Sequence, residues 1–175
     1  MPPCFVTPAE AGPQPKRRYW VSAFAGMTMV LASPGLAQEK QPPYWASIAS
    51  GQAMTHTGPG RTYPNVWLYQ RRDLPVRVVK KYENWRLIQD PDGEQGWMLV
   101  TMLSDRRTAI VKPGAPRPIR VGPYDGARPQ YMAGPGVVGR ISKCSQGWCK
   151  IEIGNRKGYV RTSDLWGVGD NEVVD

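Results

Sequence analysis

The chain contains an internal repeat with a period close to 62 residues. A tryptophan, a glycine and a leucine mark both copies, as Trp85, Gly96 and Leu103 in the first and as Trp148, Gly158 and Leu165 in the second. A period of this length is too long for a solenoid unit and fits two small domains in tandem. The 175 residues are therefore expected to hold two copies of one module.

Both copies consist of short alternating runs separated by turn residues, which predicts an all-β fold. In the first copy, VWLYQ at 66–70 and LPVRVVKKY at 74–82 read as strands, and Asp90-Pro91-Asp92-Gly93 predicts a tight turn. No stretch shows a sustained helical period with caps. Strands of this length, punctuated by Gly and Pro in modules of this size, predict two small antiparallel barrels.

The predicted boundaries follow from the composition along the chain. They are a leader at 1–37, a linker at 38–43, the first barrel at 44–111, a linker at 112–116, the second barrel at 117–168 and an acidic, frayed tail at 169–175.

The first 37 residues have the layout of a secretory signal peptide. Lys16, Arg17 and Arg18 precede a short apolar stretch, and small residues surround a cleavage point between Ala37 and Gln38. The alternatives are an uncleaved anchor and a start codon placed too far upstream. The favoured interpretation places the mature protein in the periplasm or outside the cell, with no integral membrane segment after cleavage.

The mature chain is basic. Of 23 Lys and Arg and 14 Asp and Glu, the leader carries three and one, which leaves a net charge of +7. A basic surface favours anionic partners at low salt. The positive residues are spread along both modules, which also fits an ordinary solvated surface, and export argues against nucleic acid as the partner.

Cys144 and Cys149 remain after removal of the leader, which contains the third cysteine. They flank Ser-Gln-Gly-Trp between two alternating runs, so they are expected to lie opposite each other across a hairpin and to form a disulfide. A metal site is a poor alternative, because two thiols and one distant histidine cannot complete a tetrahedral site. No metal or other cofactor is expected.

Large aromatic residues at equivalent repeat positions are the predicted plugs of two thin cores. These are Trp85 and Trp97 in the first module, and Trp148 and Tyr159 in the second.

The ordered motifs resemble the bacterial SH3-like domain family, and more specifically its tandem, exported members from proteobacteria. In the first module the motifs are Gly58-Pro59-Gly60, Tyr63-Pro64, Trp67-Leu68-Tyr69, Leu74-Pro75-Val76, Asn84-Trp85-Arg86 and Gly96-Trp97. In the second they are Gly136-Val137-Val138-Gly139, Trp148-Cys149, Gly158-Tyr159 and Leu165-Trp166-Gly167-Val168. The resemblance covers about 44–168 and implies two SH3-like barrels that bind peptidoglycan stem peptides or envelope proteins.

The Gly-Pro turn departs from the family pattern in the first module and is ambiguous in the second. The family usually has Asn-x-Arg before the Gly-Pro turn, where this chain has Met54-Thr55-His56, so a role of that arginine is in doubt here. In the second module both Gly122-Pro123 and Gly134-Pro135 compete for the equivalent turn.

Catalytic machinery is sparse in this sequence. His56 is the one histidine, so a triad or dyad lacks its usual base. No phosphate-binding loop or dinucleotide fingerprint occurs. Asp90, Asp92 and Asp105 lie in turn sequences, where Asp caps backbone amides. The protein is therefore not expected to be an enzyme.

Aromatic and basic residues around the first Gly-Pro turn form the candidate ligand site. The candidates are Tyr63, Trp67, Tyr69, Arg61, Arg71 and Arg72. Aromatic faces with a few polar groups bind extended peptides. The favoured function is a non-enzymatic binding module of the cell envelope that recognises peptide or peptidoglycan-type ligands. The alternative is an accessory subunit of an envelope enzyme or assembly.

Overall fold

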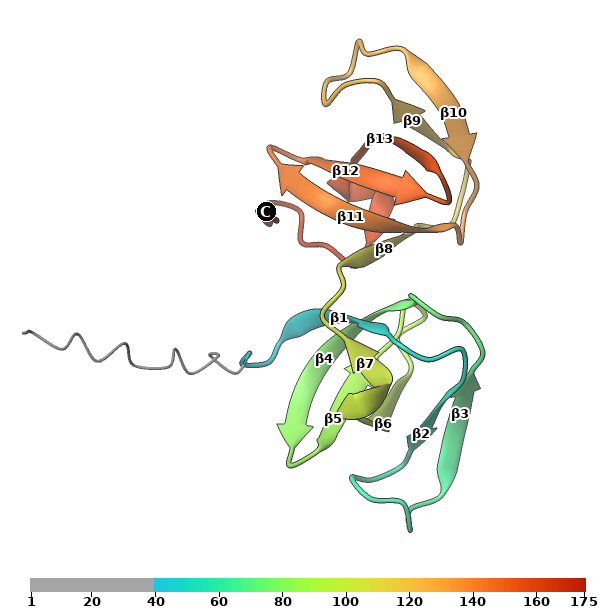
Figure 1. Ribbon diagram of the computed structural model, residues 1–175, viewed down its shortest axis with the longest axis vertical. Helices are drawn as coiled ribbons and strands as arrows, with labels where there is room; N and C mark the ends of the chain where they lie inside the picture. Colours follow the sequence, from blue (N-terminus) through green and yellow to red (C-terminus); the bar gives the residue numbers. More distant parts are fainter. Residues whose placement is uncertain (1–39) are drawn as a thin grey trace, which may run out of the picture. The chain divides into compact units, whose positions relative to one another are not determined.

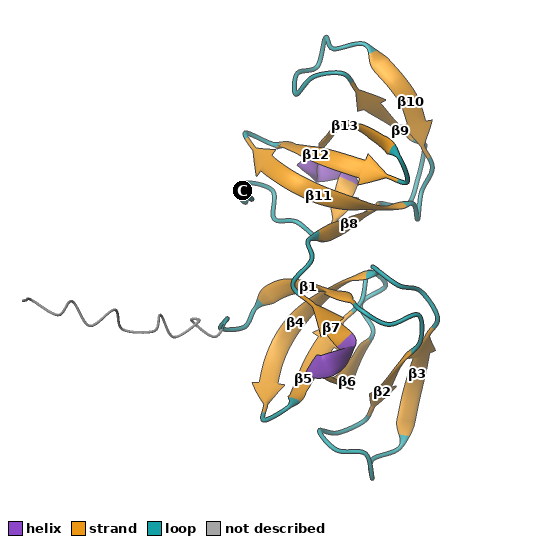
Figure 2. Cartoon of the chain, viewed as in Figure 1, coloured by secondary structure: helices purple, strands orange, loops and turns teal. Residues whose placement is uncertain are grey.

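The computed structural model describes residues 40–175, which fall within one compact unit. The predicted leader and its cleavage point lie outside the described residues. Short strands dominate the described chain, with two single-turn 3-10 helices (Figure 2). The first barrel contains β1 Tyr44–Ile48, β2 Ala53–His56, β3 Asn65–Tyr69, β4 Pro75–Tyr82, β5 Trp85–Gln89, β6 Gln95–Leu99, η1 Val100–Met102 and β7 Leu103–Ser104. The second contains β8 Thr108–Val111, β9 Arg117–Arg120, β10 Pro129–Ala133, β11 Val138–Ser145, β12 Trp148–Ile153, β13 Arg156–Arg161, η2 Thr162–Asp164 and β14 Leu165–Trp166.

The strands form two antiparallel sheets with the same topology. The first sheet has the order β3-β2-β6-β5-β4-β1-β7, and the second has β10-β9-β13-β12-β11-β8-β14. In each, a two-strand hairpin, β2–β3 or β9–β10, extends from one side of the barrel (Figure 1). The predicted all-β fold of two tandem barrels is confirmed.

One predicted domain boundary was wrong. Thr108–Val111 was assigned to the first barrel, but β8 pairs with β11 and β14 of the second sheet. It occupies the place that β1 has in the first sheet. Residues 112–116 are therefore a loop inside the second barrel, and the two sheets are joined by the three residues 105–107.

Each barrel has its own buried cluster of mainly aliphatic side chains. In β5 and β6, alternation points Ile88 and Met98 inward, where both are fully buried. In β12 and β13, Ile151 and Val160 do the same. Both cores are thin, as expected for modules of this size.

The assignment of four aromatic residues to these cores was correct in part. Trp85 and Trp148 are buried, each 8% exposed, but they occupy outward-facing strand positions and belong to neither core cluster. Trp97 and Tyr159 are only partly buried and lie outside both clusters. The strand period of two explains this: Met98 and Val160 occupy the inward positions, so their neighbours Trp97 and Tyr159 face outward.

The predicted disulfide is present. Cys144 and Cys149 lie directly opposite each other in the β11–β12 pair, and both side chains are fully buried within the second core. The bridge therefore closes the hairpin and belongs to the second barrel's cluster.

Removing this bridge should destabilise the second barrel by about 2 kcal/mol, because the closed loop is short and restricts the unfolded chain only modestly. The measurement is urea unfolding of Cys144→Ala/Cys149→Ala beside the wild-type chain with and without reductant. Reduction should lower the wild-type midpoint and leave the variant unchanged. A reductant effect of equal size in both would contradict the assignment.

The C-terminal segment is docked against the second barrel, which corrects the prediction of a frayed tail. Val174 is buried and exchanges two backbone hydrogen bonds with Cys144, at 2.9 and 3.1 Å. Arg107 donates to both carboxylate oxygens of Glu172, at 2.6 and 3.1 Å. The backbone N–H and C=O of Cys144 in β11 form an antiparallel bridge with Val174 of the C-terminal segment.

The docked tail should loosen in acid. Burial by itself raises the pKa of Glu172, but hydrogen bonds from Arg107 and the Gly169 amide, with the Arg107 charge, hold it below its ordinary value. A lowered folded-state pKa gives stability that is present above the unfolded pKa and lost as pH falls through the folded one. The protection of the amides at 170–175 against hydrogen exchange, taken relative to the intrinsic exchange rate at each pH, should therefore fall in wild type between pH 6 and pH 3. It should fall by less in Glu172→Gln and by as much as in wild type in the control Glu152→Gln. An equal loss of protection in wild type and Glu172→Gln would contradict this role.

The helices within residues 40–175 are single turns, and none has the length and apolar character of a membrane span.

Candidate binding surface on the first barrel

Strand β3 is an edge strand that exposes apolar side chains on both faces. It ends the first sheet and pairs with β2 alone. Val66, Trp67 and Leu68 are 38%, 51% and 46% exposed. Exposed consecutive apolar residues on an open strand edge are unusual in soluble proteins, because edges of this kind invite pairing with another chain. They mark β3 as a candidate binding surface.

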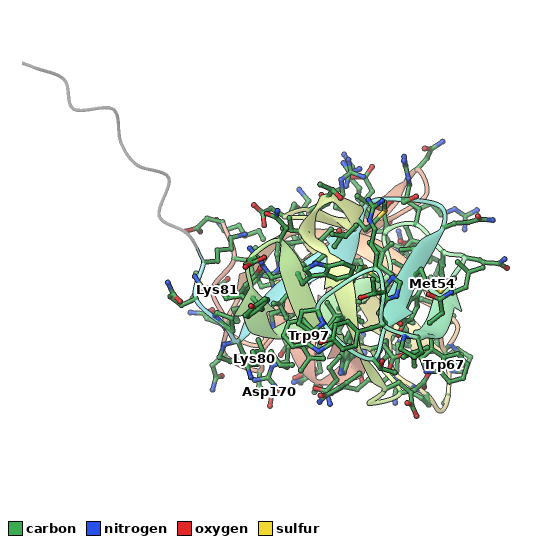
Figure 3. All side chains as sticks on the ribbon, turned by 90° about the horizontal axis from the view of Figure 1, so that it is seen from below. Met54, Trp67, Lys80, Lys81, Trp97 and Asp170 are labelled. Carbon is green, nitrogen blue, oxygen red and sulfur yellow. A yellow bond between two sulfur atoms is a disulfide. The ribbon has the colours of Figure 1, made fainter. Side chains whose placement is uncertain are left out.

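Thr55 fixes the backbone of this strand at Trp67. The buried Thr55 hydroxyl accepts a hydrogen bond from the Trp67 amide at 3.2 Å and donates to the Trp67 carbonyl at 3.3 Å. The register between β2 and β3 shifts at this point. The Trp67 backbone is thus held by a side chain while its indole lies at the outer edge of the view in Figure 3, away from Trp97.

Tyr63 closes the turn that precedes β3. Its ring packs so tightly on Gly58 and Gly60 that a Cβ at Gly58 would overlap it. Its carbonyl accepts a hydrogen bond from Nδ1 of His56 at 3.0 Å. Tyr63 remains 48% exposed, so one face of the ring is free beside the strand.

His56 makes the turn contact that an arginine makes in the second barrel. There Arg120 donates to the Ala127 carbonyl at 2.7 Å. Donor and acceptor are both displaced by 64 residues from His56 and Tyr63. The equivalent turn is therefore Gly122-Pro123, where the Tyr124 ring packs on Gly122, and the histidine preserves the structural contact of the arginine.

Tyr69, at the end of β3, is oriented by Asp90. The Tyr69 hydroxyl donates to Oδ2 of Asp90 at 3.1 Å, while Oδ1 accepts the amides of Asp92 and Glu94 at 3.0 and 2.9 Å. Burial, the Asp90 charge and this hydrogen bond raise the pKa of Tyr69, so the phenol stays a hydrogen-bond donor. The predicted capping role of Asp90 is confirmed.

The three candidate arginines lie at the two ends of the exposed strand. Arg61 belongs to the turn before β3, and Arg71 and Arg72 follow its end; all three are exposed. Arg71 donates one hydrogen bond to the Gly136 carbonyl at 2.9 Å, which leaves other guanidinium donors unused. Within residues 40–175, Arg61 and Arg72 make no ion pair.

A cavity of about 610 Å³ adjoins the end of β3. It is largely apolar and has a few polar groups at its wall, a composition typical of ligand pockets. Its lining includes Tyr69, Arg71, Asp90, Ile110, Lys112 and Trp166.

The six sequence-predicted residues thus divide into three groups. Trp67 and Tyr63 present exposed ring faces along β3 and its turn, and Tyr69 and Arg71 line the cavity beside it. Arg61 and Arg72 stand at opposite ends of the strand, and neither lines this cavity. Sequence reasoning missed Val66 and Leu68, because a short uninterrupted apolar run between turn residues is typical of a strand buried on both faces and gives no sign of exposure.

Within residues 40–175, no group of three or more His, Cys, Asp or Glu side chains is placed to hold a metal ion. His56 lies between the Tyr63 carbonyl and the Trp85 ring, whose centroid is 5.4 Å from its own. Its surroundings are those of a turn residue.

Comparison with known protein families gives one match, which covers both barrels. Residues 50–105 and 108–167 each match the Bacterial SH3 domain family. No curated protein matches the chain.

Parts of several solved structures align with this chain at low identity. NlpC2 and NlpC1 from Trichomonas vaginalis are 12% and 11% identical, with TM-scores of 0.32 and 0.34, over 73% and 74% of this chain and 49% and 47% of theirs. An NlpC/P60 family protein from Bacillus cereus is 13% identical, with a TM-score of 0.31, over 70% of this chain and 55% of its own. The chain spans about half the length of these proteins.

Proposed function

Because the chain belongs to the bacterial SH3 domain family, whose domains are binding modules, we propose that it is a non-enzymatic binding protein of the cell envelope. Its ligand is an extended peptide of the peptidoglycan type. The ligand lies along β3 of the first barrel.

The exposed edge strand is the observation that carries this proposal. An extended peptide adds to such an edge through its main chain, and pockets or faces for alternate side chains supply specificity. Val66, Trp67 and Leu68 offer apolar and aromatic faces on both sides of the edge. The cavity at the end of β3 then accepts a side chain or the end of the peptide.

The arginines at the ends of the strand suit a ligand that carries carboxylates. Arg72 is exposed and unpaired among the described residues, and guanidinium–carboxylate pairs are strong and geometrically specific. Since these side chains are exposed, their contribution is screened by salt.

An oxidising compartment agrees with the buried disulfide of the second barrel. The basic, apolar and small-residue order of the first 37 residues supports the same location. We place the mature protein in the periplasm or outside the cell.

The test is co-sedimentation of the mature chain, residues 38–175, with purified cell-wall sacculi. Saturable binding is expected, and it should weaken from about 0.01 M to about 0.15 M ionic strength. Cross-linking in intact cells is the companion measurement. No retention on sacculi, together with a single cross-linked protein partner, would contradict the proposal and support an accessory subunit.

A further inference from the structure

The outer face of the first sheet carries a second hollow next to β3, where Met54 is the cross-strand partner of Leu68. It measures about 320 Å³, and its surface is almost entirely apolar. Its lining residues are Met54, His56, Arg61, Trp85, Leu99 and Met102.

The strand register explains why this hollow forms. Ile88 and Met98 point into the barrel, so Trp85 and Leu99, which are paired across β5 and β6, point outward. Trp85 is nevertheless only 8% exposed, because His56 packs edge-on against its ring. The indole therefore forms a shielded floor and not an exposed surface ring.

The equivalent place on the second barrel is covered by the protein itself. Trp148 is paired with Arg161 across β12 and β13, and the guanidinium lies 5.0 Å from the centre of the indole. Arg161 is held there by Asp125, through a hydrogen bond of 2.9 Å and a second, shorter contact. A cation anchored by a carboxylate thus covers this tryptophan.

The repeat replaces both covering residues in the first barrel. His56 and Trp97 are bridge partners in one sheet, and Arg120 and Tyr159 are bridge partners in the other. This correspondence aligns Trp97 with Tyr159, and therefore aligns Leu99 with Arg161, each two residues further along its strand. The turn contacts of His56 and Arg120 likewise align Arg61 with Asp125.

In the first barrel, Leu99 therefore takes the place of the cation Arg161 that covers Trp148. Arg61 takes the place of Asp125, which anchors that cation, so the charge at the anchor position is reversed. Arg61 lies at the rim of the hollow, and within residues 40–175 it makes no ion pair.

We propose that the hollow over Trp85 binds a small ligand that joins an apolar group to a carboxylate, such as the apolar C-terminal residue of a peptide. The apolar group lies on Trp85 between Met54 and Leu99, and the carboxylate pairs with Arg61. This site goes beyond the peptide surface on β3: the two share Arg61, but no residue of β3 lines the hollow.

Size and charge both select this ligand class. A cavity near 320 Å³ is at the small end of ligand pockets and accepts one residue, not a long chain. Arg61 repels a cation of the kind that covers Trp148, and its planar fork matches a carboxylate. An apolar ligand without the carboxylate leaves Arg61 unpaired.

The test uses two probes of nearly equal size, N-acetyl-leucine and its neutral amide, titrated into the mature chain. Binding is followed through the indole N–H resonance of Trp85 in NMR spectra. The acid should give a saturable shift at Trp85 and none at Trp148. The amide should bind about fivefold to tenfold more weakly. A Trp85 resonance that does not move, or equal binding of both probes, overturns the proposal.

Three variants sharpen the result. Arg61→Asp should remove the preference for the acid, whereas the control Arg128→Asp, on an exposed loop of the second barrel, should keep it. Leu99→Arg/Arg61→Asp rebuilds the cover seen on the second barrel and should abolish binding while the spectrum stays folded. Retained acid binding in Arg61→Asp or in the double variant overturns the proposal. Sedimentation velocity at the same concentrations checks a further occupant: self-association lost in Arg61→Asp would show that a second copy of the chain fills the hollow and would also overturn it.

Discussion

Replacing Trp148 with alanine is expected to cost the second barrel roughly 3–5 kcal/mol, which is comparable to the whole stability of a module of this size. Trp148 is 8% exposed and lies beneath the Arg161–Asp125 pair, so truncation leaves a void and removes the surface on which the guanidinium stacks. The two cores are separate clusters, so the first barrel should stay folded. Urea unfolding followed by circular dichroism, with NMR spectra to show which barrel is lost, gives the measurement.

Trp67→Ala is the matched control for this substitution. The same side chain is removed, but from a position that is 51% exposed on an edge strand, so the loss of stability should be within about 0.5 kcal/mol. Similar unfolding midpoints for the two variants would contradict the burial assigned to Trp148.

The same Trp67→Ala variant is expected to lose most of the binding to sacculi, by tenfold or more. Exposed tryptophans at binding surfaces often dominate the energy of an interface, because they bury a large area with few rotatable bonds. Since Trp67 contributes little to the core, the loss should occur in a folded protein. Co-sedimentation at a fixed ionic strength measures the effect.

Met132→Ala is the control for this second substitution. Met132 is 57% exposed on β10, which is the edge strand of the second barrel and begins with Pro129. Its removal should leave binding unchanged. Equal losses in both variants would assign binding to both barrels, and no loss in either would remove β3 from the site.

The tandem barrels were predictable because their signals are local. Turn residues, a period of two and a repeated Trp, Gly and Leu need no knowledge of tertiary contacts. The disulfide was predictable for the same reason, since Cys144 and Cys149 flank a single hairpin turn.

Features that depend on pairing between distant segments were not predictable. The place of β8 in the second sheet depends on its pairing with β11, and the docking of Val174 on Cys144 depends on the path of the last residues. The outward position of Trp97 and Tyr159 depends on register, and a shift by one residue reverses the face of every side chain.

The candidate site shows the same division. Composition identified Trp67 and Tyr69 as aromatic residues near basic ones, and Trp67 is exposed. The hydrogen bond from Tyr69 to Asp90 joins positions 21 residues apart. The covering of Trp148 by Arg161 became informative only beside Trp85, where a leucine stands in place of that arginine. The difference between the surroundings of Trp85 and Trp148 depends on which side chains the folded strands bring over each ring, and the sequence repeat alone does not show this.

Hydrogen exchange across β3 tests the central proposal most directly. The mature chain is exchanged with and without saturating soluble peptidoglycan fragments, and uptake is compared for Asn65–Tyr69 and Pro129–Ala133, the two edge strands. Ligand paired along β3 predicts slower exchange at Asn65–Tyr69 and no change at Pro129–Ala133. Unchanged exchange at Asn65–Tyr69 under conditions where binding is saturated would contradict the proposal that this strand holds the ligand.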